Sequence, residues 1–109
     1  MAPVITGFKT TISMCRRPLV VNFSGNDSSG LAGLAADIRT QQAMGVHSAA
    51  VVTANTAQNN YGVSAINAVD HQVFISQLQA IESLPYKAVK IGLIASLQQV
   101  LTIRDFLDK

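Results

Sequence analysis

Three apolar runs alternate with segments of helical spacing along this chain, and this alternation constrains the fold more than any other feature of the sequence. The runs occupy residues 19–23, 47–54 and 87–95 and consist mostly of aliphatic residues, many of them β-branched, as is typical of buried strands. In the segments that follow, apolar residues recur three and four positions apart, as on the buried face of a helix. Buried strands joined by helices predict an α/β fold with a mostly parallel sheet covered on both faces.

Local signals set the expected ends of the helices. The first helix, over residues 30–44, should stop at Gly45, because glycine readily adopts the left-handed backbone that often follows a helix. Asp70 is expected to cap the second helix through its carboxylate. Ser96 and Gln99 form a capping box that should open the third helix.

Polar segments follow all three predicted strands. They cover residues 24–30, 54–62 and 92–96 and are rich in Gly, Ser, Thr, Asn or Gln. The part from 55 to 62, with its asparagines and closing glycine, is predicted to be a loop. Ligands of open α/β sheets bind at the carboxyl ends of the strands, where these segments should meet. The sequence therefore predicts a small-molecule site.

The glycine-rich segment after the first strand matches neither familiar phosphate-binding motif. Gly25 and Gly30 have the separation of a P-loop, but Leu31 and Ala32 stand where that motif needs a lysine and a hydroxyl residue. The stretch GLAG supplies only the last spacing of a dinucleotide fingerprint. Neither motif therefore identifies a nucleotide site.

Several residues keep two interpretations at this level. On a helix, Gly30, Gly33 and Asp37 would share one stripe, where the glycines admit a flat ring and Asp37 accepts a hydrogen bond from it. The alternative is a solvated aspartate beside turn glycines, which is the commoner case. The amide of Gln58 suits either a heterocycle or its own turn. Asp27 is expected to cap the first helix, and the alternative is that it orients the loop.

Composition narrows the class of protein. The 109 residues suit one domain, and 49% are hydrophobic while only 13% are charged. A chain with so high an apolar fraction should bury part of its surface against a partner. We therefore expect a homo-oligomer or a fragment of a larger domain. The net charge of +2 comes without a basic cluster, which argues against nucleic acid. No apolar run approaches the ~18–20 residues of a membrane span.

Thiol and imidazole groups suggest no chemistry of their own. Cys15 is the only cysteine, which excludes an intrachain disulfide and a cysteine-ligated zinc site and fits a cytoplasmic setting. His47 and His71 begin a predicted strand and a predicted helix, and neither is expected to be catalytic. No metal site is predicted. Residues 1–18 are expected to be a leader or extension, and residues 19–109 the folded part.

Three motifs give the chain a family resemblance. GNDSSGLAGLAADIRT resembles the G-x-D-x-S-G-x-A-G-x-x-A-D-x-[KR]-T signature of the phosphomethylpyrimidine kinases of thiamine biosynthesis. TANTAQNNYGV is similar to their T-A-x-T-A-Q-N-x-x-G-V segment, and VKIGLI to their V-K-I-G-M-[LI] strand. The motifs occur in the family's order and cover about residues 19–107. The resemblance implies a ribokinase-like fold, here the amino-terminal part of a three-layer α-β-α sandwich.

The resemblance also implies an activity and a site. The family phosphorylates 4-amino-5-hydroxymethyl-2-methylpyrimidine and its monophosphate with ATP and magnesium. By this resemblance, Gly25 and Ala32 would line the ring, and Asp37 and Gln58 would face its polar atoms. Thr56 would contribute backbone contacts, and Leu93 would pack on the ring.

Some features depart from the family pattern. Asn26 stands where Ser or Thr is usual, Leu93 replaces a methionine of similar volume, and Leu31 replaces a glycine. Leu31 is expected to narrow the pocket, which leaves related pyrimidine or pyridoxal substrates open. The family's G-[ST]-G-[CD] loop, its ATP-binding strands and its magnesium-linked N-x-x-E segment are absent from residues 1–109. The resemblance thus implies no catalytic residue here, and this chain alone is expected to be inactive.

Two other classes remain as alternatives. One is a non-catalytic α/β module that self-associates or pairs with another chain, in keeping with the high apolar fraction. The other is a response-regulator-like domain. That fold needs an acidic pair after the first strand and a phosphoaccepting aspartate after the third, and the sequence has neither.

Overall fold

The computed structural model describes residues 17–109, so most of the predicted leader, residues 1–16, lies outside the described part. Four strands form one sheet in the spatial order β3-β2-β1-β4. The strands are β1 (Leu19–Asp27), β2 (His47–Asn59), β3 (Gly62–Ala68) and β4 (Tyr86–Ile91). The helices are α2 (Gly33–Ala43), α3 (His71–Ile81) and α4 (Leu97–Leu107).

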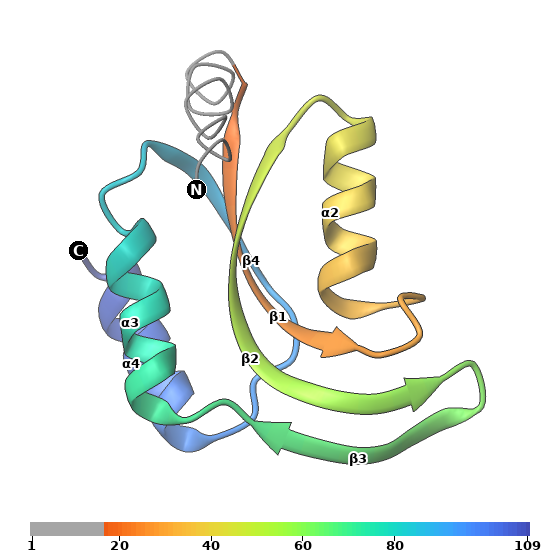
Figure 1. Ribbon diagram of the computed structural model, residues 1–109. Coiled ribbons are helices and arrows are strands. Elements are labelled where there is room, and N and C mark those ends of the chain that lie inside the picture. Colours follow the sequence, from red (N-terminus) through yellow and green to blue (C-terminus); the bar gives the residue numbers. More distant parts are fainter. Residues whose placement is uncertain (1–16) are drawn as a thin grey trace, which may run out of the picture.

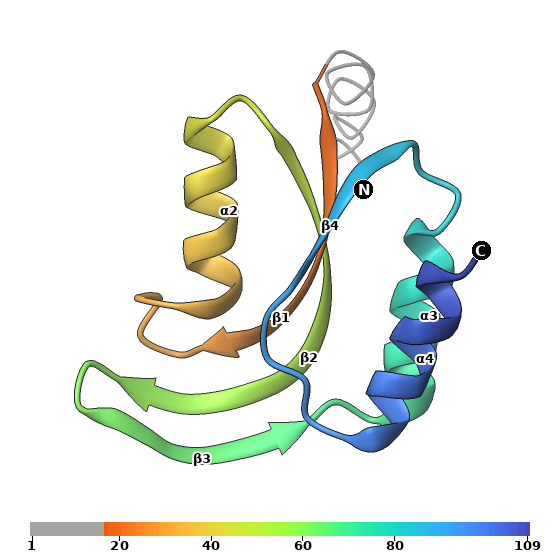
Figure 2. The ribbon, with the colours of Figure 1, turned by 180° about the vertical axis from the view of Figure 1, so that it is seen from behind.

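The sheet is mostly parallel and lies between helices. Strands β2 and β4 run parallel to β1, whereas β3 pairs antiparallel with β2. Helix α2 covers one face of the sheet, and α3 and α4 lie together against the other (Figure 1, Figure 2). This arrangement confirms the predicted α/β class. In the described part of the chain, no helix is long and apolar enough to cross a membrane.

The hydrophobic core lies between the sheet and the α3–α4 layer. Its central side chain is Phe23 of β1, whose ring is 5.8 Å from that of Phe106 in an edge-to-face arrangement and 6.2 Å from that of Phe74. Fully burying an apolar side chain of this size stabilises a fold by about 1.5–3 kcal/mol. The buried cluster consists of Val21, Phe23, Val51, Phe74, Leu78, Ile103 and Phe106.

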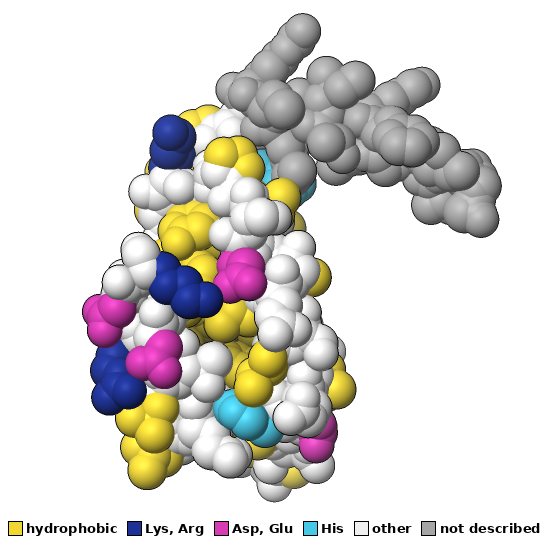
Figure 3. Space-filling model, turned by 90° about the vertical axis from the view of Figure 1, so that its left-hand side faces the viewer, with side chains coloured by type: hydrophobic (Ala, Val, Ile, Leu, Met, Phe, Trp, Pro, Cys, Tyr) yellow, Lys and Arg dark blue, Asp and Glu magenta, His cyan; other side chains and the backbone are white. Residues whose placement is uncertain are grey.

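The outer face of the α3–α4 layer carries charges of both signs. Lysine and arginine side chains alternate there with acidic ones around apolar groups (Figure 3). Lys109 pairs with Glu82 across the two helices at 3.1 Å, and Arg104 pairs with the adjacent Asp105 at 3.0 Å. Among residues 17–109, the charged side chains of this face therefore form no basic stripe of the kind that binds nucleic acid.

The predicted helix ends are largely observed. Asp70 accepts hydrogen bonds from the amides of Gln72 and Val73, and Gly45, with φ of +77°, follows α2. Ser96 accepts the amide of Gln99 at 3.2 Å, but the box is not reciprocal. The Gln99 side chain instead accepts the amide of Ala95 and donates to the carbonyl of Thr53, which ties α4 to β2.

The prediction of a loop over residues 55–62 was wrong. Strand β2 continues to Asn59, and the chain turns there and returns as β3. The segment is uncharged and exposed along all of β3, so it lacks the apolar-polar alternation that marks a half-buried strand. Gly62, with φ of +151°, closes the hairpin.

The expected start of the first helix was also wrong. Helix α2 begins at Gly33, and Gly30 belongs to the preceding loop with φ of +76°. The stripe of Gly30, Gly33 and Asp37 on one helix therefore does not form. Gly33 itself has φ of +60°, and a Cβ atom there would collide with the carbonyl oxygen of Gly25. The two glycines thus permit the sharp turn from β1 into α2.

Candidate functional site

A hollow of about 280 Å³ opens where β1 and β2 end at the same edge of the sheet. The loop before α2, the segment after β4 and the inner face of the β2–β3 hairpin form its sides. Its lining consists of Gly25, Asp27, Ala32, Gly33, Thr56, Gln58, Val63, Ile66 and Leu93. The hollow therefore brings together five of the residues that the sequence assigns to a site, namely Gly25, Ala32, Thr56, Gln58 and Leu93.

Glycine backbone forms one wall of the hollow. A Cβ atom on Gly25 would lie 2.8 Å from Cδ2 of Leu93, so the Leu93 side chain occupies the space that a larger residue at position 25 would need. Next to it, Gly33 approaches the carbonyl of Gly25 too closely for any side chain. The two glycines therefore allow Leu93 and the start of α2 to pack closely against β1 at this wall.

Asp27 organises the loop between β1 and α2. Its buried carboxylate accepts the amide and hydroxyl of Ser29, each at 2.8 Å, and the amides of Leu31 and Ala32 at 3.1 and 2.8 Å. Burial alone would raise the pKa of Asp27, but these hydrogen bonds outweigh it and hold the pKa below its usual value. Helix α2 has Ala32 at its N-cap and no side-chain cap, so Asp27 orients the loop and does not cap the helix.

Thr56 and Gln58 project from the end of β2. The Thr56 hydroxyl lies 2.9 Å from the carbonyl of Asn26 and 3.1 Å from Oε1 of Gln58. The backbone of Gln58 is fixed by Ser28, whose hydroxyl contacts both its amide and its carbonyl at 3.0 Å. The Gln58 side chain thus stands at the rim of the hollow on a fixed backbone.

The hairpin adds two apolar residues that sequence reasoning missed. Val63 pairs with Gln58 and Ile66 with Thr56, and a register shift between these pairs brings both side chains to the side of the hollow. Both are exposed, at 51% and 57%. The turn-forming stretch NNYG followed by V-S-A-I is the signal in the sequence that could have identified this hairpin.

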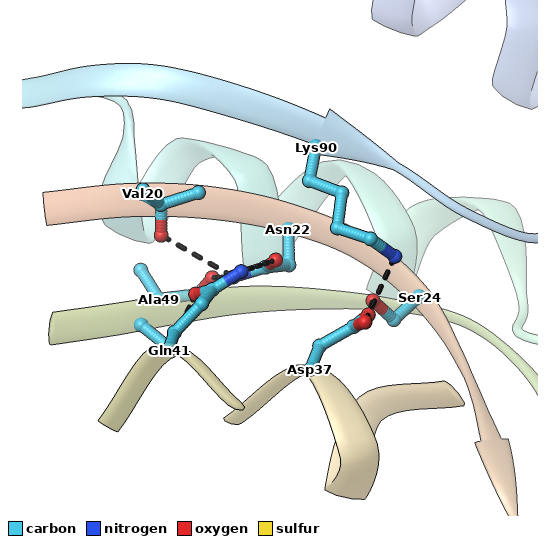
Figure 4. A network of polar contacts seen from close by, with 8 residues as sticks. Val20, Asn22, Ser24, Asp37, Gln41, Ala49 and Lys90 are labelled. Carbon is cyan, nitrogen blue, oxygen red and sulfur yellow. Dashed lines mark hydrogen bonds and ion pairs between the residues drawn. The ribbon is translucent and has the colours of Figure 1, made fainter. Parts of the chain in front are cut away.

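Asp37 is not among the residues that line the hollow. Its carboxylate accepts the hydroxyl of Ser24 at 2.7 Å and pairs with Lys90 of β4 at 2.8 Å (Figure 4). The assignment of Asp37 to the pyrimidine stays a prediction. Leu31, expected to narrow the pocket, is 63% exposed and is likewise absent from the lining.

Two features of the described residues bear on nucleotide and metal binding. Within residues 17–109, no group of three or more His, Cys, Asp or Glu side chains is placed to hold a metal ion. The loop from Gly25 to Ala32 carries no lysine that could contact a triphosphate.

Comparison with solved structures places the fold in a class. The chain superimposes on phosphomethylpyrimidine kinase from Clostridium difficile 630 with a TM-score of 0.78 and 36% identity, over 84% of this chain and 40% of that one. Pyridoxal kinase from Staphylococcus aureus, solved with AMP-PCP and pyridoxal, gives a TM-score of 0.77 at 22% identity, over 84% and 35%. The fold is thus that of the ribokinase-like α/β kinases.

The sequence narrows this class to a family. Residues 27–109 match the phosphomethylpyrimidine kinase family. The hydroxymethylpyrimidine/phosphomethylpyrimidine kinase of Rhizobium meliloti is 41% identical over 92 residues, and that of Mycobacterium tuberculosis is 40% identical over 87 residues. These matches cover 84% and 79% of this chain but 35% and 32% of the relatives. The chain belongs to the phosphomethylpyrimidine kinase family and spans about a third of the length of these relatives.

Proposed function

We propose that this chain supplies the pyrimidine pocket of a kinase that phosphorylates 4-amino-5-hydroxymethyl-2-methylpyrimidine and its monophosphate. The observation that carries this proposal is the hollow at the ends of β1 and β2, where Gly25, Ala32, Thr56, Gln58 and Leu93 meet. Its volume of about 280 Å³ lies just below the ~300–1,000 Å³ typical of small-molecule pockets. A single substituted ring suits such a space better than a dinucleotide does.

Each lining residue has a role in this proposal. The ring lies against the backbone of Gly25 and beside Ala32, and the Leu93 side chain packs on it. Thr56 contributes backbone contacts. Gln58 turns its amide toward the polar atoms of the pyrimidine, since an amide supplies both a donor and an acceptor. Val63 and Ile66 cover the ring from the hairpin and keep water from it.

Phosphoryl transfer is proposed to need more than residues 17–109. ATP would donate the phosphate and Mg²⁺ would neutralise its charge, and within residues 17–109 no group of three or more His, Cys, Asp or Glu side chains is placed to hold a metal ion. Removing one donor from an anion-stabilising site typically costs ~10²–10³ in rate. A coupled ADP-release assay with this chain, the pyrimidine, ATP and Mg²⁺ should therefore show no useful turnover, and turnover near that of a complete relative would contradict this part.

Calorimetric titration with hydroxymethylpyrimidine tests the pocket. We expect saturable binding that Gln58→Ala weakens, because the substitution removes the amide from the rim of the hollow. Gln98→Ala is the matched control, since Gln98 is an exposed amide on α4 outside the hollow. A folded sample that binds no pyrimidine at millimolar concentration would refute the proposal, as would equal losses in the two variants.

A second candidate is a non-catalytic module that pairs with another copy or another polypeptide. One observation favours it: six apolar side chains between residues 91 and 107 are 38–72% exposed, next to the β4 side of the sheet. They are Ile91, Leu93, Leu97, Val100, Leu101 and Leu107. So much exposed apolar surface usually marks an interface. Light scattering distinguishes the two, because a stable monomer that binds pyrimidine excludes this candidate.

A further inference from the structure

Polar side chains hold α2 against the sheet. None of the α2 residues is fully buried, whereas α3 and α4 each bury apolar side chains in the core. Two α2 residues, Asp37 and Gln41, are four positions apart and therefore lie on one face of the helix. Both point toward the sheet and contact polar residues of β1 (Figure 4).

The Gln41 contact involves no residue that lines the hollow. Its amide nitrogen donates to Oδ1 of Asn22 at 2.7 Å, and its oxygen accepts the hydroxyl of Ser48 at 2.6 Å. Asn22, which is fully buried, also donates to the carbonyl of Ala49 at 3.0 Å. This cluster joins α2 to β1 and β2, and none of its residues lines the hollow.

The Asp37 contact is made beside the hollow and joins three segments. Ser24, which donates to one carboxylate oxygen, directly precedes Gly25 on β1. Lys90, which pairs with the other oxygen, lies three residues before Leu93. Asp37 itself follows Gly33 by one helical turn. Each partner therefore belongs to a segment that lines the hollow, and the carboxylate is their common point.

We propose that Asp37 is a positioning residue for the pyrimidine pocket and that Lys90 acts through it. Held by Ser24 and Lys90, the carboxylate sets the distance between the wall at Gly25, the start of α2 and the segment that carries Leu93. This inference rests on the proposed function, because the pocket is the one that would hold the pyrimidine.

The geometry favours positioning over direct contact. Both carboxylate oxygens of Asp37 already have a partner, and the side chain is only 13% exposed. The residues that line the hollow do not include Asp37, so a ligand there would contact Asp37 only if its side chain moved. Lys90 keeps 48% of its side chain exposed, so the ion pair is partly solvated and its loss should leave the domain folded.

A double-mutant cycle on pyrimidine affinity tests the proposal. Asp37→Asn and Lys90→Met should each weaken hydroxymethylpyrimidine binding by about two- to fivefold, the size expected for a half-exposed pair. The double variant should bind no more weakly than either single one. Lys87→Met, which removes another exposed lysine of β4, should leave affinity unchanged. Asp37→Asn weakening binding while Lys90→Met does not would mean direct ligand contact and overturn the proposal.

A second measurement needs no ligand. In amide NMR spectra of the free chain, the effect of each substitution is measured at amides of a different segment from the one that carries the substitution. Asp37→Asn should shift the amide of Leu93, and Lys90→Met should shift those of Ala32 and Gly33, whereas Lys87→Met should shift none of them. Unmoved amides would overturn the positioning role even if pyrimidine binds. A chain that shows these shifts but binds no pyrimidine would refute the proposed function and leave the positioning of the three segments in place.

Discussion

Replacing Gly33 with alanine should destabilise this domain more than the same change at Gly30. Both glycines have positive φ, +60° and +76°, so alanine at either position bears the left-handed backbone cost of roughly 1–2 kcal/mol. Alanine also restricts the unfolded chain, which returns about 0.4–1 kcal/mol at each site. These two terms are common to both variants and cancel in the comparison.

The difference between the two sites comes from space. A Cβ atom on Gly30 would meet no atom within 4 Å, whereas on Gly33 it would collide with the Gly25 carbonyl. That obstacle is backbone, and it lies in the strand segment that pairs with Gly33 through the bridge to Asn26. To remove this collision, the backbone at Gly33 or Gly25 must shift by a substantial fraction of a bond length. Strain of this kind costs about 1–3 kcal/mol in packed sites.

Urea unfolding followed by circular dichroism measures both variants. We expect Gly33→Ala to lose at least about 1 kcal/mol more than Gly30→Ala, the lower end of that strain. Pyrimidine binding should fall with Gly33→Ala as well, because the wall at Gly25 moves. Equal free energies of unfolding for the two variants would show that the close approach of α2 to β1 is not tight, and the glycine wall would lose its explanation.

Three further predictions concern the loop, the core and the hairpin. Because hydrogen bonds lower the pKa of Asp27 in the folded state, its contribution to stability is present above its ordinary pKa of 3.8 and is lost as pH falls through the folded value. Asp27→Asn should therefore reduce the dependence of the unfolding free energy on pH below about pH 5. An unchanged pH dependence in this range would contradict the prediction. Phe23→Ala should cost about 3–5 kcal/mol in urea unfolding, since the ring is fully buried between Phe74 and Phe106, and a loss below 1 kcal/mol would refute its central place in the core. Val63→Ser should weaken pyrimidine binding in calorimetry with little change in stability, because the side chain is half exposed and lines the hollow; unchanged affinity would exclude the hairpin from the pocket.

Local signals in the sequence predicted much of the fold. Asp70 caps α3 and Gly45 follows α2 because both effects depend on a few neighbouring residues. The apolar runs placed three of the strands, since buried parallel strands are nearly continuous in hydrophobicity. Strand β3 was missed because residues 62–68 are exposed and follow no apolar pattern. These residues form a strand through their pairing with β2.

The candidate site was predictable only in part. Gly25, Thr56 and Gln58 could be placed together because the ends of parallel strands share one edge of a sheet. The partners of Asp37 could not be found in this way. Lys90 lies 53 positions away in the chain, and only the pairing of β4 with β1 brings its ammonium group to the carboxylate.

NMR titration of the labelled chain with hydroxymethylpyrimidine shows where the ligand binds. We expect saturable shifts of the amides of Gly25, Ala32, Gln58 and Leu93, whereas the amides of the α3–α4 outer face should not move. Shifts confined to that outer face, or none at millimolar pyrimidine, would contradict the assignment of the pocket.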